Sequence, residues 1–194
     1  MKYMRTITIL QLEEKFSHLE FHADNMHVYS LYVSNGSDCM EETQHFLISW
    51  LHKNGSFPLY LYISAYDDMN LTEELHKQNI IFQKKLLEQQ PIFEVKLNTA
   101  DEMKRVMEQF FYMSAHSEIM MLTTEAVQIS MQNSINMFHA TVPQDEYIMI
   151  VEHDGQGLQL LTTKEKWFHE AGIVATITDI DEQECMRKYY GLTK

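Results

Sequence analysis

Strand-like segments and amphipathic helices alternate irregularly along the chain, and this order constrains the fold more than any other feature. Hairpins are predicted for residues 18–33, around the turn residues Asp24 and Asn25, and for residues 147–161, around an Asp-Gly-Gln-Gly turn. A doubly wound sheet would instead repeat one strand and one helix. The sequence therefore predicts an α+β fold, with a mixed or mostly antiparallel sheet built from hairpins and several packed amphipathic helices.

Two helices have the clearest signals. Apolar residues recur at helical spacing over residues 40–53, after an N-cap pattern at Asp38 and before an Asn-Gly pair. Thr99 and Glu102 form a capping box ahead of a second helix, whose apolar residues continue to Phe111. We expect both helices to pack their apolar stripe against the rest of the fold.

Weaker patterns predict the remaining elements. Helices are expected over residues 72–89 and 163–171, with Gly172 as a C-terminal cap, and a last helix begins at Asp181. Strands are expected over residues 5–12, 58–64, 92–97 and 173–180. Residues 124–142 fit two strands around an Asn-Ser turn and also fit a helix.

The length of 194 residues suits one domain. Residues 58–75 and 147–167 both run from a strand through an acidic turn to a Leu-Thr pair, which raises the alternative of two similar subdomains meeting near residues 98–100. No linker rich in Pro, Gly or Ser marks a boundary there. We therefore predict a single α+β domain over residues 1–194, with the two subdomains as the alternative.

The net charge of −13, from 28 acidic and 15 basic residues, restricts the kinds of partner. Duplex nucleic acid is bound chiefly through Lys and Arg, and these are scattered singly or in pairs, so nucleic-acid binding is not expected. An acidic surface instead attracts a basic protein by long-range electrostatics. We therefore expect a protein partner of basic character, while no feature of the sequence indicates an oligomeric state.

The sequence also predicts a location. Residues 1–16 mix Thr, Gln and Glu into the stretch where a secretory signal would be apolar. The longest apolar runs are far shorter than the ~20 residues that span a bilayer. Cys39 and Cys185 are far apart and show no metal-binding spacing. Together these features predict a cytoplasmic protein with reduced cysteines and no membrane partner.

The leading functional hypothesis is a small, non-enzymatic binding or regulatory protein without a cofactor, comparable in charge and size to protein inhibitors and immunity proteins. Tyrosines surrounded by charged residues are common in protein interfaces. The predicted partner-binding residues are Tyr60, Tyr62, Tyr66, Asp67, Asp68, Glu73 and Glu74. The sequence contains no Gly-x-Ser-x-Gly, P-loop or His-Glu-x-x-His motif, which disfavours an enzyme.

The alternative hypothesis is an enzyme or sensor that depends on one divalent metal ion. Alternate side chains on a strand share a face, so His18, Glu20 and His22 would project together. If the turn that follows comprised two residues, His27 would lie opposite His22. Imidazole and carboxylate groups are typical ligands of zinc and related ions. His139 lies among apolar residues, and we interpret it as a hydrogen-bonded core histidine rather than a ligand.

Overall fold

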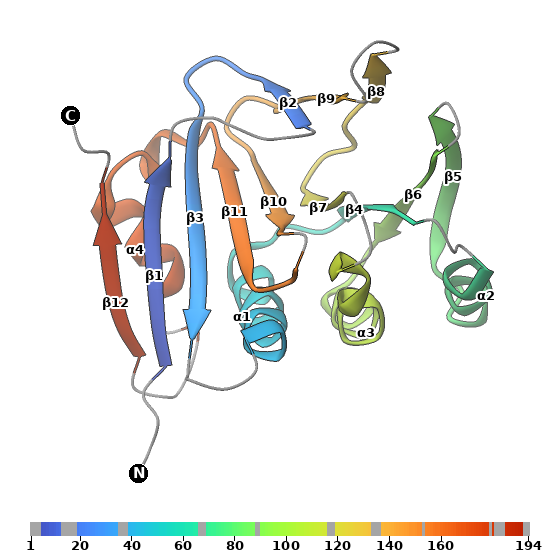
Figure 1. The fold of residues 1–194 in the computed structure, drawn as a ribbon, viewed down its shortest axis with the longest axis horizontal. Coiled ribbons are helices and arrows are strands. Elements are labelled where there is room, and N and C mark those ends of the chain that lie inside the picture. Colours follow the sequence, from blue (N-terminus) through green and yellow to red (C-terminus); the bar gives the residue numbers. More distant parts are fainter. Residues whose placement is uncertain are drawn as a thin grey trace.

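Nine strands of the described residues form one large sheet, which extends across Figure 1. In chain order they are β1 (Arg5–Leu12), β3 (His27–Ser34), β4 (Leu59–Ser64), β5 (Ile81–Leu87), β6 (Gln90–Leu97), β7 (Met120–Thr123), β10 (Tyr147–Val151), β11 (Gly157–Thr162) and β12 (Cys185–Tyr190). Their order in the sheet is β12-β1-β3-β11-β10-β7-β4-β6-β5. Each neighbouring pair is antiparallel except β1 and β12, which run parallel.

In the described part of the chain, a small second sheet and four α-helices complete the fold, and the predicted α+β class is confirmed. The small sheet has the order β2-β9-β8, from β2 (Leu19–His22), β8 (Ile129–Gln132) and β9 (Met137–Thr141). The helices are α1 (Cys39–Asn54), α2 (Met69–Lys77), α3 (Ala100–Phe110) and α4 (Glu170–Ile177), with 3-10 turns η1 (Phe111–Ala115) and η2 (Glu165–Trp167). The structure is a computed structural model that describes residues 5–12, 19–34, 39–65, 69–87, 90–115, 119–132, 137–152, 154–178, 180 and 185–191.

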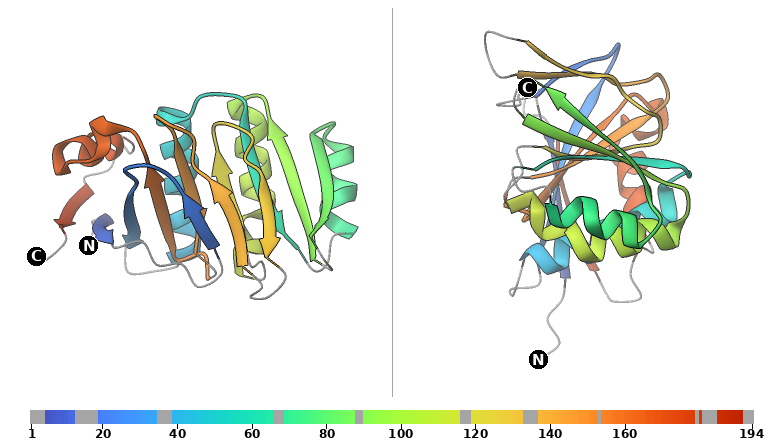
Figure 2. Two further views of the ribbon diagram at one scale, coloured as in Figure 1. Left: turned by 90° about the horizontal axis from the view of Figure 1, so that it is seen from above. Right: turned by 90° about the vertical axis from the view of Figure 1, so that its right-hand side faces the viewer.

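The elements are arranged in three layers, which Figure 2 shows from two directions. Helices α1, α2 and α3 cover one face of the large sheet, and the small sheet lies over the other face. Central strands are therefore buried on both sides. In β4, Leu61 and Ile63 pack toward the helices, while Tyr62 between them packs toward the small sheet. This double burial explains why such strands consist of continuous apolar runs.

The elements with the clearest sequence signals are confirmed. Helix α1 covers residues 40–53, and α3 begins after Thr99, whose Oγ1 accepts a hydrogen bond from the Glu102 backbone N–H at 3.2 Å. The Glu102 carboxylate accepts the Asn98 backbone N–H at 2.7 Å, which completes the cap. The second hairpin is also confirmed, because β10 and β11 pair around a turn in which Gly155 has a φ of 69°.

The predicted hairpin over residues 18–33 is wrong, although the chain does turn there. Asn25 has a φ of 53°, as expected for a tight turn. However, β2 pairs with β9 in the small sheet, whereas β3 pairs with β1 and β11 in the large sheet. The turn therefore reverses the chain and also moves it from one sheet to the other.

Several weaker predictions are corrected by the structure. The helix predicted over residues 72–89 ends at Lys77, and β5 follows a left-handed Asn79 with a φ of 54°. The helix predicted over residues 163–171 is the 3-10 turn η2, and the strand predicted over residues 173–180 is helix α4, which contains Gly172. The ambiguous stretch forms the strands β8 and β9.

Tertiary contacts determine the secondary structure of the two C-terminal elements, α4 and β12. Ile173 and Ile177 lie about one helical turn apart and are both buried, and the Trp50 indole Nε1 donates a hydrogen bond to Thr176 Oγ1 at 3.1 Å. These contacts hold α4 against α1 and override the strand preference of its β-branched residues. The expected final helix is instead β12, which pairs with β1, and its predicted cap at Asp181 lies outside the described residues.

Strands from the two halves of the chain are interleaved in the large sheet. β7, β10 and β11 follow residue 100 in sequence, yet they lie between β3 and β4, which precede residue 98. The two segments of similar sequence also differ in structure where they are described. Residues 58–75 contain a strand and the start of a helix, whereas residues 147–167 contain a hairpin and a 3-10 turn.

Candidate metal site

Three side chains that could bind a metal ion meet on the outer face of the small sheet. β2 runs parallel to β9, and the register places Glu20 directly beside His139. Because side chains alternate across a strand, Phe21 and Ala140 point into the core, where both are buried. Glu20, His22 and His139 therefore share the opposite face, which is turned away from the large sheet.

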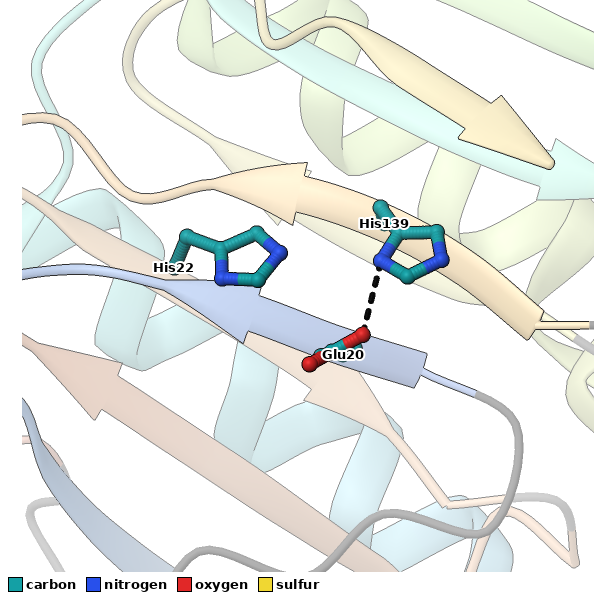
Figure 3. A group of neighbouring side chains, drawn as sticks. All are labelled: Glu20, His22 and His139. Atoms are coloured by element: carbon teal, nitrogen blue, oxygen red, sulfur yellow. Dashed lines mark ion pairs between the residues drawn. The ribbon is translucent and has the colours of Figure 1, made fainter. Parts of the chain in front are cut away.

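The three side chains are close enough to share one ion. One ligand atom from each residue lies within 4.8 Å of those from the other two. The His139 Nδ1 is 2.8 Å from the Glu20 Oε2, the contact drawn as a dashed line in Figure 3. The rings of His22 and His139 are nearly parallel, with an interplanar angle of 3° and centroids 5.8 Å apart. The group is thus already assembled on two adjacent strands.

His139 is the anchored member of this group. Its side chain is 18% exposed, whereas that of Glu20 is 47% exposed and His22 is an exposed residue. Its Nδ1 faces the Glu20 carboxylate, and its Nε2 is buried with no hydrogen-bond partner in the described part of the chain. A proton on Nδ1 rather than on Nε2 fits both observations, because Nδ1 can donate it to Glu20 and no N–H is left buried and unpaired.

Two imidazoles and one carboxylate suit zinc and other divalent first-row transition metals. Zinc ligands lie about 2.1 Å from the ion and hence about 3.4 Å from one another in a tetrahedral site. The described donor atoms lie within 4.8 Å of one another, so each pair needs to approach by at most about 1.4 Å to reach this spacing. Three protein ligands leave a coordination position for water, and a metal ion there could acidify the water or polarise a carbonyl group.

His27 is not part of this group, which corrects the prediction that it lies opposite His22. It lies on β3 in the large sheet, where its ring stacks on that of Phe168 with centroids 4.1 Å apart. Its Nδ1 is 3.2 Å from the Gln11 Nε2. The predicted approach of His22 to His27 depended on the hairpin, which does not form. His18 lies outside the described residues.

We expect His27 to make the stability of the protein depend on pH. Burial, and then the nearby His169, lower the pKa of His27 below its ordinary value of 6.5. The unfolded chain therefore takes up this proton more readily than the folded protein. The contribution of His27 to the free energy of unfolding is complete above pH 6.5. It is lost as the pH falls through the lower pKa that His27 has in the folded state. When the pH is lowered from about 7.5 to about 5, the free energy of unfolding measured in urea should fall less in the H27N variant than in the wild type. Equal losses would contradict this assignment.

Tyr62, predicted as a partner-binding residue, is in the core and is 2% exposed. Its hydroxyl donates a hydrogen bond to the Val127 carbonyl at 3.2 Å and accepts one from the Val127 backbone N–H at 2.9 Å. Burial raises the pKa of this hydroxyl. Tyr62 thus connects β4 to the segment between β7 and β8 and is not available to a partner.

The Y62F variant should lower the free energy of unfolding by about 1–3 kcal/mol, because it leaves a buried N–H and a buried carbonyl of Val127 unpaired. Urea denaturation measures this loss. Tyr60 is a suitable control, since it lies on the same strand face but is only half-buried. Y60F should change stability by less than about 0.5 kcal/mol. A loss in Y62F as small as that in Y60F would contradict the role given to the hydroxyl.

The other predicted partner-binding residues do not gather into one described surface. Tyr60 packs against the core under the small sheet, whereas Glu73 and Glu74 lie on α2. Both carboxylates form ion pairs with Lys77, at 3.1 and 2.7 Å, and hydrogen bonds from Lys77 and Gln109 lower the pKa of Glu74. Tyr66, Asp67 and Asp68 lie outside the described residues.

Comparisons of the chain with protein-family models, with curated proteins and with solved structures find no match. Among the described residues, none of the helices is long and apolar enough to cross a membrane. Arguments about function therefore start from the geometry of the candidate site.

Proposed function

We propose that this protein binds one divalent first-row transition-metal ion, with zinc as the reference ion, through Glu20, His22 and His139. The observation that supports this proposal is the convergence of three donors from two strands that are distant in the sequence. A simple ion pair between Glu20 and His139 would not require a second imidazole within reach. The exposed His22 supplies that second imidazole and completes a two-histidine, one-carboxylate set.

The geometry also argues for moderate affinity. When a metal ion occupies Nδ1 of His139, the ring proton must lie on Nε2, which is buried and has no partner among the described residues. An unpaired buried donor costs about 1–3 kcal/mol. Structural zinc sites with four ligands have binding free energies of about 10–16 kcal/mol. A three-ligand site that carries this cost should bind with about 8 kcal/mol, which corresponds to a dissociation constant in the micromolar range.

The site fits a ligand-binding or hydrolytic role better than a structural role. Structural zinc sites are closed by four protein ligands, and small domains need them when they lack a large core. Here the core is extensive on both sides of the large sheet, and the candidate ligands lie outside it. Removal of metal by a chelator should therefore leave the protein folded, with its melting temperature lowered only by the loss of ligand binding.

Isothermal titration calorimetry with Zn²⁺, on protein purified without a histidine tag, tests the proposal. We expect one equivalent to bind the wild type, and the E20Q variant to bind at least about tenfold more weakly because it loses the charged ligand. H45A is the matched control, since His45 is exposed on α1 and is not one of the three candidate ligands. Absence of stoichiometric binding, or equal affinity in E20Q and H45A, would refute the proposal.

The partner and the cellular location expected from the net charge remain predictions, separate from the proposed metal binding. The net charge of −13 supports a basic protein partner, the absence of nucleic-acid binding and, with the isolated cysteines, a cytoplasmic location. If a basic partner binds through α2, replacement of Glu73 by Lys should weaken the complex, and the weakening should be largest at low salt. Affinity unchanged by this substitution would exclude Glu73 from such an interface.

A further inference from the structure

A groove adjoins the candidate metal site. Its volume is about 610 Å³, and it is lined by His22, Lys85, Gln128, Ser130, His139 and Thr141, together with Ile129 and Ala140. None of the described residues that line it is acidic, although the chain carries a net charge of −13. The groove thus joins two of the candidate metal ligands to a lysine from β5 of the large sheet.

We propose that this groove binds a small oxyanion, either a carboxylate or a phosphate group, between the bound metal ion and Lys85. The inference rests on the proposed function, because it requires the metal ion. The divalent charge of the ion and the single charge of Glu20 leave a net positive site with a coordination position open to an oxygen ligand. Hydroxyls and an amide along the groove can donate hydrogen bonds to the remaining oxygens.

Lys85 is held in place for this role. Its Nζ is 2.6 Å from the Glu94 Oε2, and the Glu94 side chain is only 14% exposed, whereas that of Lys85 is 49% exposed. An ammonium group has three donors, so Lys85 can contact both Glu94 and an anion in the groove. Glu94 also partly neutralises Lys85. The metal ion is therefore needed to make the groove attractive to an anion, and metal-free protein should not bind one.

Lys84 provides a matched control for Lys85. The two lysines are adjacent on β5, so their side chains point to opposite faces of the sheet. The Nζ of Lys84 lies over the Phe93 ring, 5.6 Å from its centroid, on the side of the core that packs against the helices. K84M and K85M thus remove the same charge from neighbouring positions, but only K85M removes it from the groove.

The test is calorimetric titration of protein loaded with one equivalent of Zn²⁺, using inorganic phosphate and, separately, acetate as probes. The probe that binds more tightly shows whether the groove prefers a phosphate or a carboxylate group. K85M should weaken binding of that anion by about tenfold, K84M should change it by less than about twofold, and E94Q, which releases Lys85 from its ion pair, should strengthen it.

The outcomes separate the two proposals. Zinc-loaded K85M that binds the anions as tightly as the wild type would overturn the oxyanion site while leaving zinc binding in place. Equal anion binding with and without zinc would overturn it as well, because the ion would then play no part. Failure of the wild type to bind zinc would overturn the proposed function, and with it the oxyanion site.

Discussion

Replacement of Gly172 by alanine is expected to lower the free energy of unfolding by about 3 kcal/mol or more. Gly172 lies in the first turn of α4, directly against η2. A Cβ atom there would lie 1.8 Å from the Lys166 carbonyl oxygen and 3.2 Å from the Trp167 Cα. Both atoms belong to the backbone, so no side-chain rotation can relieve the overlap. Because Trp167 packs edge-on against the fully buried Trp50, separating η2 from α4 would disturb the core.

The sign of this effect makes the prediction sharp. Helix propensity alone would predict that a Gly-to-Ala change inside a helix stabilises the protein by about 1 kcal/mol. The neighbouring A171G variant, at an exposed position of the same helix, should lose about that amount through propensity alone. Urea denaturation of both variants distinguishes the two effects. If G172A were as stable as the wild type or more stable, the close approach of α4 to η2 would be wrong.

The second large effect is expected at the proposed metal site. Removal of either imidazole, in H22A or H139A, should weaken Zn²⁺ binding by at least about 100-fold, or about 2.7 kcal/mol, because two protein ligands seldom hold the ion. H22A is the cleaner variant, since His22 is exposed and its loss should leave stability nearly unchanged. H139A also loses the hydrogen bond to Glu20, and circular dichroism should establish that it folds.

The H45A variant again serves as the control, and its zinc affinity should equal that of the wild type. His27 offers a second comparison, because the sequence alone placed it in the metal site whereas the structure places it beside Phe168. H27N should therefore retain zinc binding. Loss of zinc binding in H27N, with retention in H139A, would favour the hairpin site predicted from the sequence and contradict the assignment made from the structure.

The sequence predicts two of the three residues of this candidate site. Alternation along residues 18–23 correctly places Glu20 and His22 on one face of a strand, since that periodicity is local. The third candidate ligand comes from β9, which pairs with β2 in parallel and is separated from it by more than 100 residues. Parallel pairing at that distance leaves no turn signal. The alternating residues around His139 could have assigned it to a solvent-facing position, once residues 137–141 were taken as a strand.

Tyr62 and α4 also show that local sequence patterns do not reveal contacts between distant parts of the chain. The strand predicted over residues 58–64 is confirmed as β4, but no local pattern indicates that a second sheet will cover the face that carries Tyr60 and Tyr62. Likewise, the β-branched residues of α4 favour a strand locally, and only the contacts with α1 select the helix. Caps and tight turns are predictable because their interactions lie within a few residues.

Crystallography with zinc tests the central claim most directly. Crystals grown with one equivalent of Zn²⁺, with data collected on both sides of the zinc absorption edge, locate the ion by its anomalous signal. We predict one strong peak about 2.0–2.2 Å from a nitrogen of His22, the Nδ1 of His139 and an oxygen of Glu20. A peak at other residues, or no peak at these three residues in protein that calorimetry shows to be saturated with zinc, would contradict a metal site on the small sheet.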